Sequence, residues 1–204
     1  MQKLLIGSNN AHKVGELRAI FSGLPFELLT LADAGIDYEV EETGTTFVEN
    51  ALLKAEIYAQ MSGLPTLADD SGLEVAALDG KPGIYTARWA LPDQNNQHRA
   101  YARVLEELKG KPFHDRIARF VCVIAIAWPG QPTEVVEGIL PGVIAEEPRG
   151  VGGFGYDPVF YLLDYDKHLA ELDPEEKNRI SHRGQACALA REVLERLAQI
   201  EQRA

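Results

Sequence analysis

The chain has 204 residues, a formal net charge of −11 at pH 7 and two cysteines. This length is enough to bury a sizeable core, and we expect a single domain over residues 1–204, with two lobes sharing a sheet. The negative charge argues against broad nucleic-acid binding, because nucleic-acid-binding proteins present a basic surface to phosphates.

No apolar run approaches the ~20 residues that span a bilayer, and the first residues do not have the pattern of a signal peptide. We therefore expect a cytoplasmic protein with no membrane partner. Cys122 and Cys187 lie in apolar runs without metal-ligand spacing. We expect both to be reduced core residues.

A strand is predicted over residues 3–8, and apolar residues follow at helical spacing from Lys13 onward. The turn between them reads Ser-Asn-Asn-Ala-His-Lys. A strand that runs into a helix N-terminus presents free backbone N–H groups, which attract phosphate, and Lys13 would add a positive charge. The alternative is that Asn10 only caps the helix and Lys13 is solvated. No Gly-x-x-x-x-Gly-Lys-Ser/Thr motif is present, which disfavours a P-loop NTPase.

An acidic segment, residues 39–44, follows a predicted strand over residues 26–31. The next residues, Thr46 to Glu49, have the capping-box pattern, which predicts a helix from Phe47 to about Ser62. Glu41, Glu42 and Lys54 are exposed charges by default. Glu42 becomes a candidate magnesium ligand if it meets the acidic pair that comes next, because magnesium prefers oxygen ligands.

Two adjacent carboxylates, Asp69 and Asp70, end an apolar run and are followed by Ser71 and Gly72. We expect a strand that ends at these acids. Neighbouring carboxylates repel each other and are tolerated where a cation, water or a substrate compensates their charge. A divalent metal site is the first hypothesis, and a solvated turn is the alternative because Asp, Ser and Gly are common turn formers.

The middle of the chain predicts more sheet. A turn over residues 80–83 and a helix over residues 96–108 come first. Residues 116–128 give the strongest strand signal, and residues 133–144 are expected to be their antiparallel neighbour across a Pro-Gly-Gln-Pro turn. A mixed sheet is therefore expected rather than a purely parallel one.

A glycine-dense stretch, residues 149–158, contains Gly-x-Gly-x-x-Gly. We reject a dinucleotide-binding motif because Asp157 and Pro158 argue against a helix opening there. The glycines would let the backbone approach a ligand while Phe154 or Tyr156 supplies a stacking surface. The alternative is that these rings only anchor the loop.

Near the end of the chain, a short helix is predicted to begin around Pro174, and Ser181 can cap the final helix. The expected apolar face of that final helix is Ala186, Leu189, Ala190, Val193, Leu197 and Ile200. His182 and Arg183 lie at its N-terminus, where the helix dipole disfavours cations. Their placement indicates a role other than helix stability.

Four motifs together resemble the inosine triphosphate pyrophosphatase family. They are residues 8–13, 68–73, 152–158 and 180–184, in the order and at the separations of that family. Many members have glycine where this chain has Asn9, which affects only the geometry of the turn. We draw no functional conclusion from Trp89, which stands where a smaller aromatic residue is expected.

The resemblance implies an enzyme that hydrolyses inosine, deoxyinosine and xanthosine triphosphates to the monophosphate and pyrophosphate. It also implies Mg²⁺ as cofactor, a homodimer, and an α/β fold in which a long mixed β-sheet is flanked by helices, in two lobes with the active-site cleft between them. Asp70 matches the proton acceptor, and Lys13 would neutralise developing charge. The positions that match the metal site are Glu42 and Asp70, with Asp69 as a helper.

The remaining roles also follow from the resemblance. The positions that match the phosphate-binding turn are Ser8, Asn9, Asn10, Ala11, His12 and Lys13, with Lys54 and Ser71 nearby. The positions that match nucleotide and base binding are Phe154, Gly155, Tyr156, Asp157, Lys177, His182 and Arg183. A 6-oxo purine presents a hydrogen-bond acceptor where adenine presents a donor, so we expect Arg183 to read that atom, with His182 beside it and Phe154 stacking on the base.

Two other functions stay open from the sequence. One is a related pyrophosphatase that acts on modified pyrimidine or a broader set of triphosphates, and the other is a nucleotide-binding module that does not hydrolyse. A glycosidase is disfavoured, because adjacent residues of a strand point to opposite faces and cannot easily flank one bond.

Overall fold

The structure is a computed structural model that describes residues 1–89 and 97–201. The chain divides into two compact units. Unit 1 consists of Met1–Asp70, Cys122–Gly138 and Arg183–Ala204, and unit 2 consists of Ser71–Val121 and Ile139–His182. Within the described residues, no helix is both long enough and apolar enough to cross a membrane.

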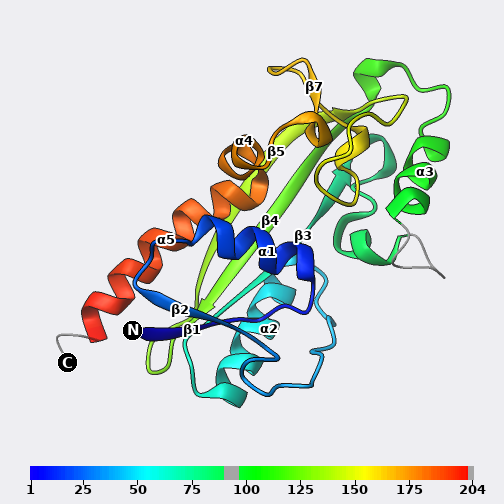
Figure 1. Cartoon of the computed structure of the whole chain (residues 1–204). Coiled ribbons are helices and arrows are strands. Elements are labelled where there is room, and N and C mark those ends of the chain that lie inside the picture. Colours follow the sequence, from blue (N-terminus) through cyan, green and yellow to red (C-terminus); the bar gives the residue numbers. More distant parts are fainter. Residues whose placement is uncertain (90–96, 202–204) are drawn as a thin grey trace. The chain divides into compact units, whose positions relative to one another are not determined.

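Across the described residues, seven strands form one sheet in the order β2-β1-β3-β4-β5-β6-β7 (Figure 1). The strands are β1 (Gln2–Ile6), β2 (Phe26–Thr30), β3 (Thr66–Val75), β4 (Ile117–Ala127), β5 (Glu134–Ile144), β6 (Phe160–Leu162) and β7 (Lys167–His168). β1 pairs in parallel with β2 and β3, whereas β6 pairs antiparallel with β5 and β7. The sheet is therefore mixed, as predicted, and β4 and β5 are neighbours in it.

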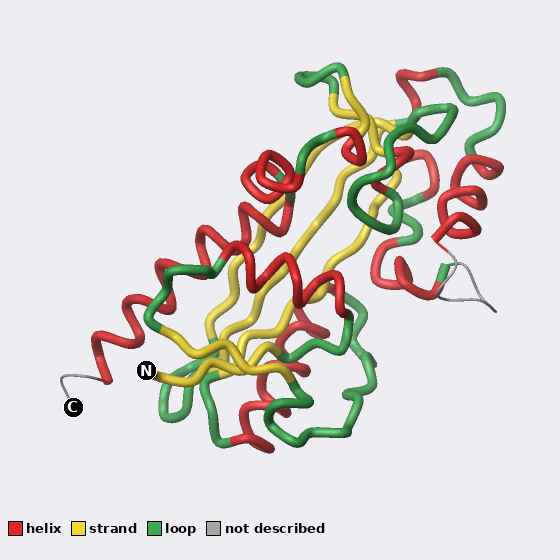
Figure 2. Tube along the Cα trace, in the orientation of Figure 1, coloured by secondary structure: helices red, strands yellow, loops and turns green. Residues whose placement is uncertain are grey.

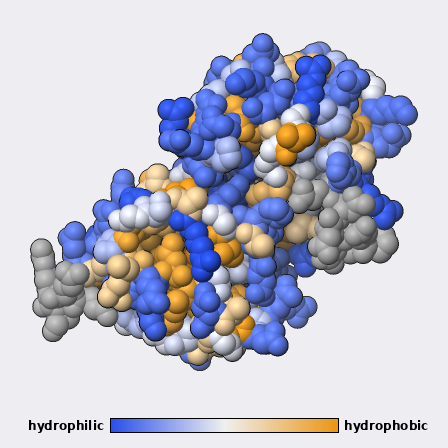
Figure 3. Space-filling model, viewed as in Figure 1, coloured by the Kyte–Doolittle hydropathy of each residue, from blue (hydrophilic) through white to orange (hydrophobic). Residues whose placement is uncertain are grey.

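Unit 1 has helices on both faces of its strands. Figure 1 shows α1 (Ala11–Ile20) and α5 (His182–Glu201) on one face and α2 (Phe47–Ser62) on the other. The strand period of two explains this arrangement. Leu4 of β1 belongs to the core cluster that holds Leu17 of α1 and Ala190 of α5, whereas Leu5 packs in the cluster with Tyr58 of α2. Figure 3 shows hydrophobic and hydrophilic residues side by side on the visible face of this unit.

The predicted ends of α2 and the predicted burial of the two reduced cysteines are confirmed. Thr46 accepts a hydrogen bond from the backbone N–H of Glu49, and Glu49 accepts one from that of Thr46, which completes the capping box. The helix ends at Gly63, whose φ of 69° is the left-handed conformation that glycine tolerates. Cys122 and Cys187 are both buried.

The expected end of β3 at the acidic pair is wrong. The strand continues to Val75, and both Leu73 and Val75 are completely buried. Glu74 between them is only half-buried, as expected from the period of two of a strand. The burial of Leu73 and Val75 on one face therefore overrides the turn preference of Asp, Ser and Gly. The solvated-turn alternative is wrong as well, because Asp69 and Asp70 are buried.

The apolar face predicted for α5 is wrong in part. Leu189 and Ile200 are exposed, whereas Leu194 and Ala198 are buried together with the other four predicted positions. The buried face of this helix therefore includes Leu194 and Ala198 in place of Leu189 and Ile200. The two short strands β6 and β7 were not predicted.

Unit 2 combines the remaining helices, α3 (Gln97–Glu107) and α4 (Pro174–Ile180), with short turns and loops, drawn in Figure 2. Asn96, the first residue of the predicted third helix, lies outside the described residues. Asp157–Val159 forms a 3₁₀ turn, so no α-helix opens after the glycine-dense loop, as expected. Phe120 and Phe160 pack with ring centroids 4.5 Å apart in the core of this unit.

Candidate active site

The parallel pairing of β1 with β3 brings the Ser8–Lys13 turn beside the acidic pair. Ile6 is opposite Leu67, and the backbone N–H of Gly7 donates to the Leu67 carbonyl at 2.8 Å. A Cβ atom on Gly7 would lie 2.9 Å from the Tyr58 ring and 3.2 Å from Ala68 Cβ. Only glycine permits this close approach, so it fixes where the turn begins.

Side chains of the turn itself cap helix α1. The Asn10 side chain accepts hydrogen bonds from the backbone N–H groups of His12 at 3.0 Å and Lys13 at 3.2 Å. The Ser8 hydroxyl accepts one from the N–H of Asn10 at 3.2 Å. In the structure these three N–H groups donate to side chains of the turn, so the capping role of Asn10 is confirmed, and phosphate binding by this turn stays a prediction. Asn9 and Ala11 are exposed positions of the same turn.

Asp69 lies between two cations. Its Oδ2 atom is 3.0 Å from Lys13 Nζ and 3.3 Å from Arg183 Nη2. Arg183 also contacts Glu16 of α1, with Nη1 2.5 Å from Oε2. Burial alone would raise the pKa of Asp69, but the positive charges of Lys13 and Arg183 outweigh it and hold that pKa well below its usual value. The alternative that Lys13 is solvated is therefore wrong, because its ammonium is paired with the buried Asp69 carboxylate.

Asp70 has a different set of neighbours. Its Oδ2 atom accepts a hydrogen bond from the Asn50 side-chain amide at 3.1 Å, and its Oδ1 atom is 3.7 Å from Lys54 Nζ. Glu42 Oε1 is 2.6 Å from the same ammonium. Burial raises the pKa of Asp70 although Lys54 and Lys13 oppose it, and the negative charge of Glu42 raises it further. The burial that would lower the pKa of Lys54 is outweighed by the surrounding carboxylates, which raise it.

The Glu42 and Asp70 carboxylates fit a divalent cation better than Asp69 does. Both converge on one ammonium, and burial raises the pKa of Asp70, an effect that the positive charge of a bound cation would oppose. Asp69 already has two cations at short distance. Over residues 1–89 and 97–201, no three Asp, Glu, His or Cys side chains form a metal-binding cluster. A magnesium ion bound here would therefore take its other ligands from water and substrate, as magnesium commonly does.

In unit 2, Asp157 organises the glycine-dense loop. Its Oδ2 atom accepts hydrogen bonds from the backbone N–H of Phe154 and from Lys177 Nζ, both at 2.8 Å. The Lys177 ammonium lies 4.9 Å from the centre of the Phe154 ring, a cation–π distance. A Cβ atom on Gly153 would lie 2.0 Å from the same Asp157 oxygen. The loop conformation thus depends on glycine at this position.

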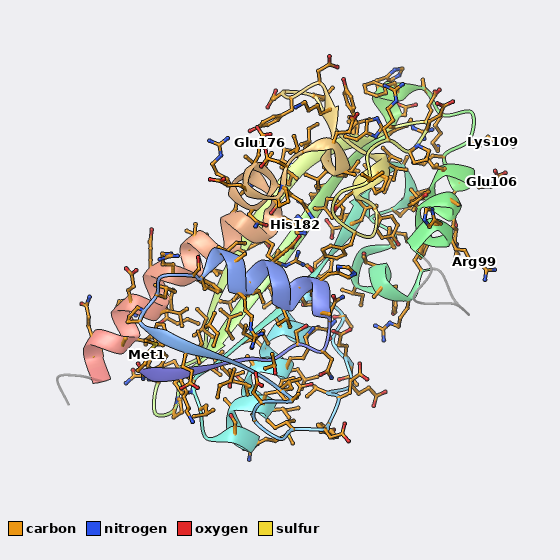
Figure 4. All side chains as sticks on the ribbon, in the orientation of Figure 1. Met1, Arg99, Glu106, Lys109, Glu176 and His182 are labelled. Carbon is orange, nitrogen blue, oxygen red and sulfur yellow. The ribbon has the colours of Figure 1, made fainter. Side chains whose placement is uncertain are left out.

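The aromatic residues of the loop differ in exposure. Tyr156 is buried, and its hydroxyl donates to the Thr86 carbonyl at 2.9 Å, so its ring anchors the loop. The Phe154 ring is only partly buried, as is Gly155. His182, labelled in Figure 4 at the start of α5, stacks on Phe120 with the ring planes 11° apart. Phe154 is therefore the loop ring that can still stack on a ligand.

A family model described as the Ham1 family matches residues 4–193. The chain belongs to the Ham1 family. This confirms the resemblance drawn from the four motifs.

Relatives named dITP/XTP pyrophosphatase match nearly the whole chain. The protein from Geobacillus kaustophilus is 52% identical over 91% of this chain and 91% of its own length. The protein from Geobacter sulfurreducens is 48% identical over 95% of this chain and 97% of its own. Among solved structures, the Ham1 protein of Staphylococcus aureus has a TM-score of 0.86 at 41% identity, covering 95% of this chain and 98% of that one. The HAM1 protein of Coxiella burnetii has a TM-score of 0.87 at 41% identity, covering 96% and 100%.

Sequence reasoning missed two residues of this candidate site. Glu16 lies three residues after Lys13, and Asn50 lies four residues before Lys54, so each shares a helix face with a predicted site residue. Asn50 could also have been noticed by itself. Asparagine is a poor helix former, so its position inside a predicted helix indicates that its side chain forms hydrogen bonds. Ser71, half-buried in β3, is the predicted site residue that directly follows Asp70.

Proposed function

We propose that this chain hydrolyses noncanonical purine nucleoside triphosphates, namely ITP, dITP and XTP, to the monophosphate and pyrophosphate. The observation that carries the proposal is the similarity to relatives named dITP/XTP pyrophosphatase. They are 52% and 48% identical to this chain over 91% and 95% of its length. The arrangement of unit 1 supports it, because Lys13 of α1 and Lys54 of α2 form ion pairs with the two carboxylates of β3 and with the Glu42 carboxylate in the loop before α2. The two alternatives from the sequence are not favoured.

Asp70 is the proton acceptor in this proposal. It orients a water molecule and takes its proton as the water oxygen attacks the α-phosphorus. The bond from the α-phosphorus to the bridging oxygen breaks, and pyrophosphate leaves with the electron pair. The raised pKa of Asp70 suits this role, since a stronger base accepts the proton more readily.

The cations of unit 1 compensate the charge of the triphosphate. Lys13 and Lys54 each already neutralise a carboxylate, so both are held in place before substrate arrives. A magnesium ion held by Glu42 and Asp70 would supply charge neutralisation at the phosphate oxygens. The turn residues Ser8 to Lys13, together with Ser71, contact the phosphates in this proposal.

The base is selected by Phe154, Lys177, His182 and Arg183. Phe154 stacks on the purine, and the cationic side chains present donors to its 6-oxo group. Adenine presents a donor at that position and would leave such groups unpaired, which discriminates strongly against it. Gly155, Tyr156 and Asp157 shape the loop that carries Phe154.

We also propose a homodimer, a cytoplasmic location, one domain over residues 1–204, and no nucleic-acid or membrane partner. These follow from the family resemblance and from composition. Sedimentation of the purified chain measures the dimer directly.

The function is tested by incubating the protein with ITP and Mg²⁺ and following the products by ³¹P NMR. Pyrophosphate and inosine monophosphate are expected. Release of orthophosphate from the γ-position, or no reaction, contradicts the proposal. Parallel reactions with XTP, ATP and modified pyrimidine triphosphates define the preference for the base.

A further inference from the structure

The side-chain amide of Asn50 bridges two parts of unit 1. Asn50 is completely buried in α2. Its Oδ1 atom accepts a hydrogen bond from the backbone N–H of Gly44 at 2.8 Å, and its Nδ2 atom donates to Asp70 Oδ2 at 3.1 Å. One amide therefore connects the loop before α2 with the carboxylate in β3.

The orientation of this amide is determined by its partners. A backbone N–H can only donate, so the oxygen of the amide must face Gly44. The NH₂ group then faces Asp70, and Oδ2 of Asp70 must act as an acceptor. The other oxygen, Oδ1, is the one on the side of Lys54. Asn50 and Lys54 lie one turn apart on α2. They therefore contact different oxygens of the same carboxylate.

The loop fits against Asn50 because residue 44 has no side chain. A Cβ atom on Gly44 would lie 2.6 Å from Asn50 Oδ1, 2.7 Å from Glu49 Cβ and 3.0 Å from the Asn50 backbone nitrogen. Glu42, which contacts Lys54, lies two residues earlier in the same loop. The contact between Gly44 and Asn50 therefore fixes the segment that carries Glu42.

We propose that Asn50 is a positioning residue, whose amide orients the Asp70 carboxylate for proton acceptance and docks the Glu42 loop onto α2. The proposal rests on the proposed function, because Asp70 and Glu42 have their roles there. Asn50 touches no reacting atom itself. It acts by holding two groups at a fixed spacing on one helix.

The first test replaces the amide by an apolar side chain of similar size. Asn50→Leu removes both hydrogen bonds, and we expect kcat for ITP to fall about 10- to 100-fold, because misplacing a catalytic group by about 1 Å costs on this order. KM should change less than threefold. Gln60→Met, an amide replacement at an exposed site of the same helix, should leave both constants unchanged. If Asn50→Leu does not fold, Asn50→Ala takes its place, because it also removes both hydrogen bonds and adds no charge beside Asp70.

The second test separates the loop from the carboxylate. Gly44→Ala should push the loop away while the Asn50 amide still faces Asp70. Binding of Mn²⁺ alone, followed by electron paramagnetic resonance without substrate, is expected to weaken about 3- to 10-fold, with kcat at saturating Mg²⁺ within threefold of wild type. Gly15→Ala, where an added Cβ meets nothing within 4 Å, is the matched control.

The outcomes distinguish this inference from the proposed function. If the wild-type chain does not release pyrophosphate from ITP, the function fails. If the wild type is active but folded Asn50 variants keep kcat within threefold, the orienting role is overturned. If Gly44→Ala binds Mn²⁺ as the wild type does, the docking role is overturned.

Discussion

Asp69 and Asp70 are neighbours in β3, yet each carboxylate is paired with a different lysine. Lys13 Nζ lies 3.0 Å from Asp69, whereas Lys54 Nζ lies 3.7 Å from Asp70. The alternation of a strand turns the two side chains apart and gives them opposite environments. Asp69 has its pKa lowered by Lys13 and Arg183 despite its burial, and Asp70 has its pKa raised chiefly by burial. The acidic pair thus consists of one carboxylate held ionised by two cations and one whose raised pKa suits the proposed proton acceptor.

Asp70→Asn should lower activity and raise stability together. The loss of the base is expected to reduce kcat for ITP by about 10²- to 10⁴-fold. Because the folded-state pKa of Asp70 is raised, its ionised form costs stability at pH above that pKa, and the neutral amide removes the cost. We expect the melting temperature at pH 7, measured with a chelator present, to rise roughly 2–4 °C. Near-normal turnover in this variant would exclude Asp70 as the base.

Asp69→Asn should have the opposite effect on stability. Its folded-state pKa is lowered, so its contribution is fully present above the ordinary aspartate pKa of about 3.9 and is lost as the pH falls through the lowered pKa. The variant should be about 3 kcal/mol less stable at pH 7, since it leaves the Arg183 guanidinium with one carboxylate fewer, and its stability should decline less steeply below pH 4. Urea unfolding from pH 2.5 to 7 measures both effects, with the exposed Asp37→Asn as control. A wild-type acid slope in Asp69→Asn would contradict this account.

Much of the fold could be predicted because its signals are local. The Thr46–Glu49 capping box and Gly63 fixed both ends of α2, and continuous apolar runs marked β4 and its neighbour β5. β3 was predicted too short because the turn preference of Asp, Ser and Gly competes with the burial of Leu73 and Val75, which depends on tertiary packing. The two-residue strand β7 carries too few residues to show any periodicity.

The site could be predicted as a set of positions but not as a set of contacts. Residue types and order identified Lys13, Glu42, Lys54 and Asp70. Asp69 contacts both Lys13 and Arg183. Arg183 lies 114 positions further along the chain than Asp69. No local pattern encodes such a pairing. The bridging role of Asn50 likewise depends on where β3 places Asp70 relative to α2.

Arg183→Lys should alter both base preference and stability. Lysine keeps the charge but cannot present the planar fork that now contacts Glu16 and Asp69 together. We expect the ratio of kcat/KM for ITP to that for ATP to fall about tenfold or more, and the melting temperature to fall as well. Arg179→Lys, at an exposed position of α4, is the control. If the ratio of kcat/KM for ITP to that for ATP is unchanged, Arg183 does not recognise the base and its role is purely structural.

Gly153→Ala should weaken nucleotide binding through the loop rather than through chemistry. Gly153 has a φ of 69°, and an added Cβ would lie 2.0 Å from the Asp157 oxygen that holds Phe154 and Lys177. The methyl group must displace that carboxylate, so the Phe154 ring loses its support. We expect KM for ITP to rise about tenfold with kcat within threefold, since Asp70 and its neighbours are untouched. Gly130→Ala has a similar φ of 79° with open space around it, and therefore controls for backbone strain alone. If both variants raise KM equally, strain and not the Asp157 contact explains the effect.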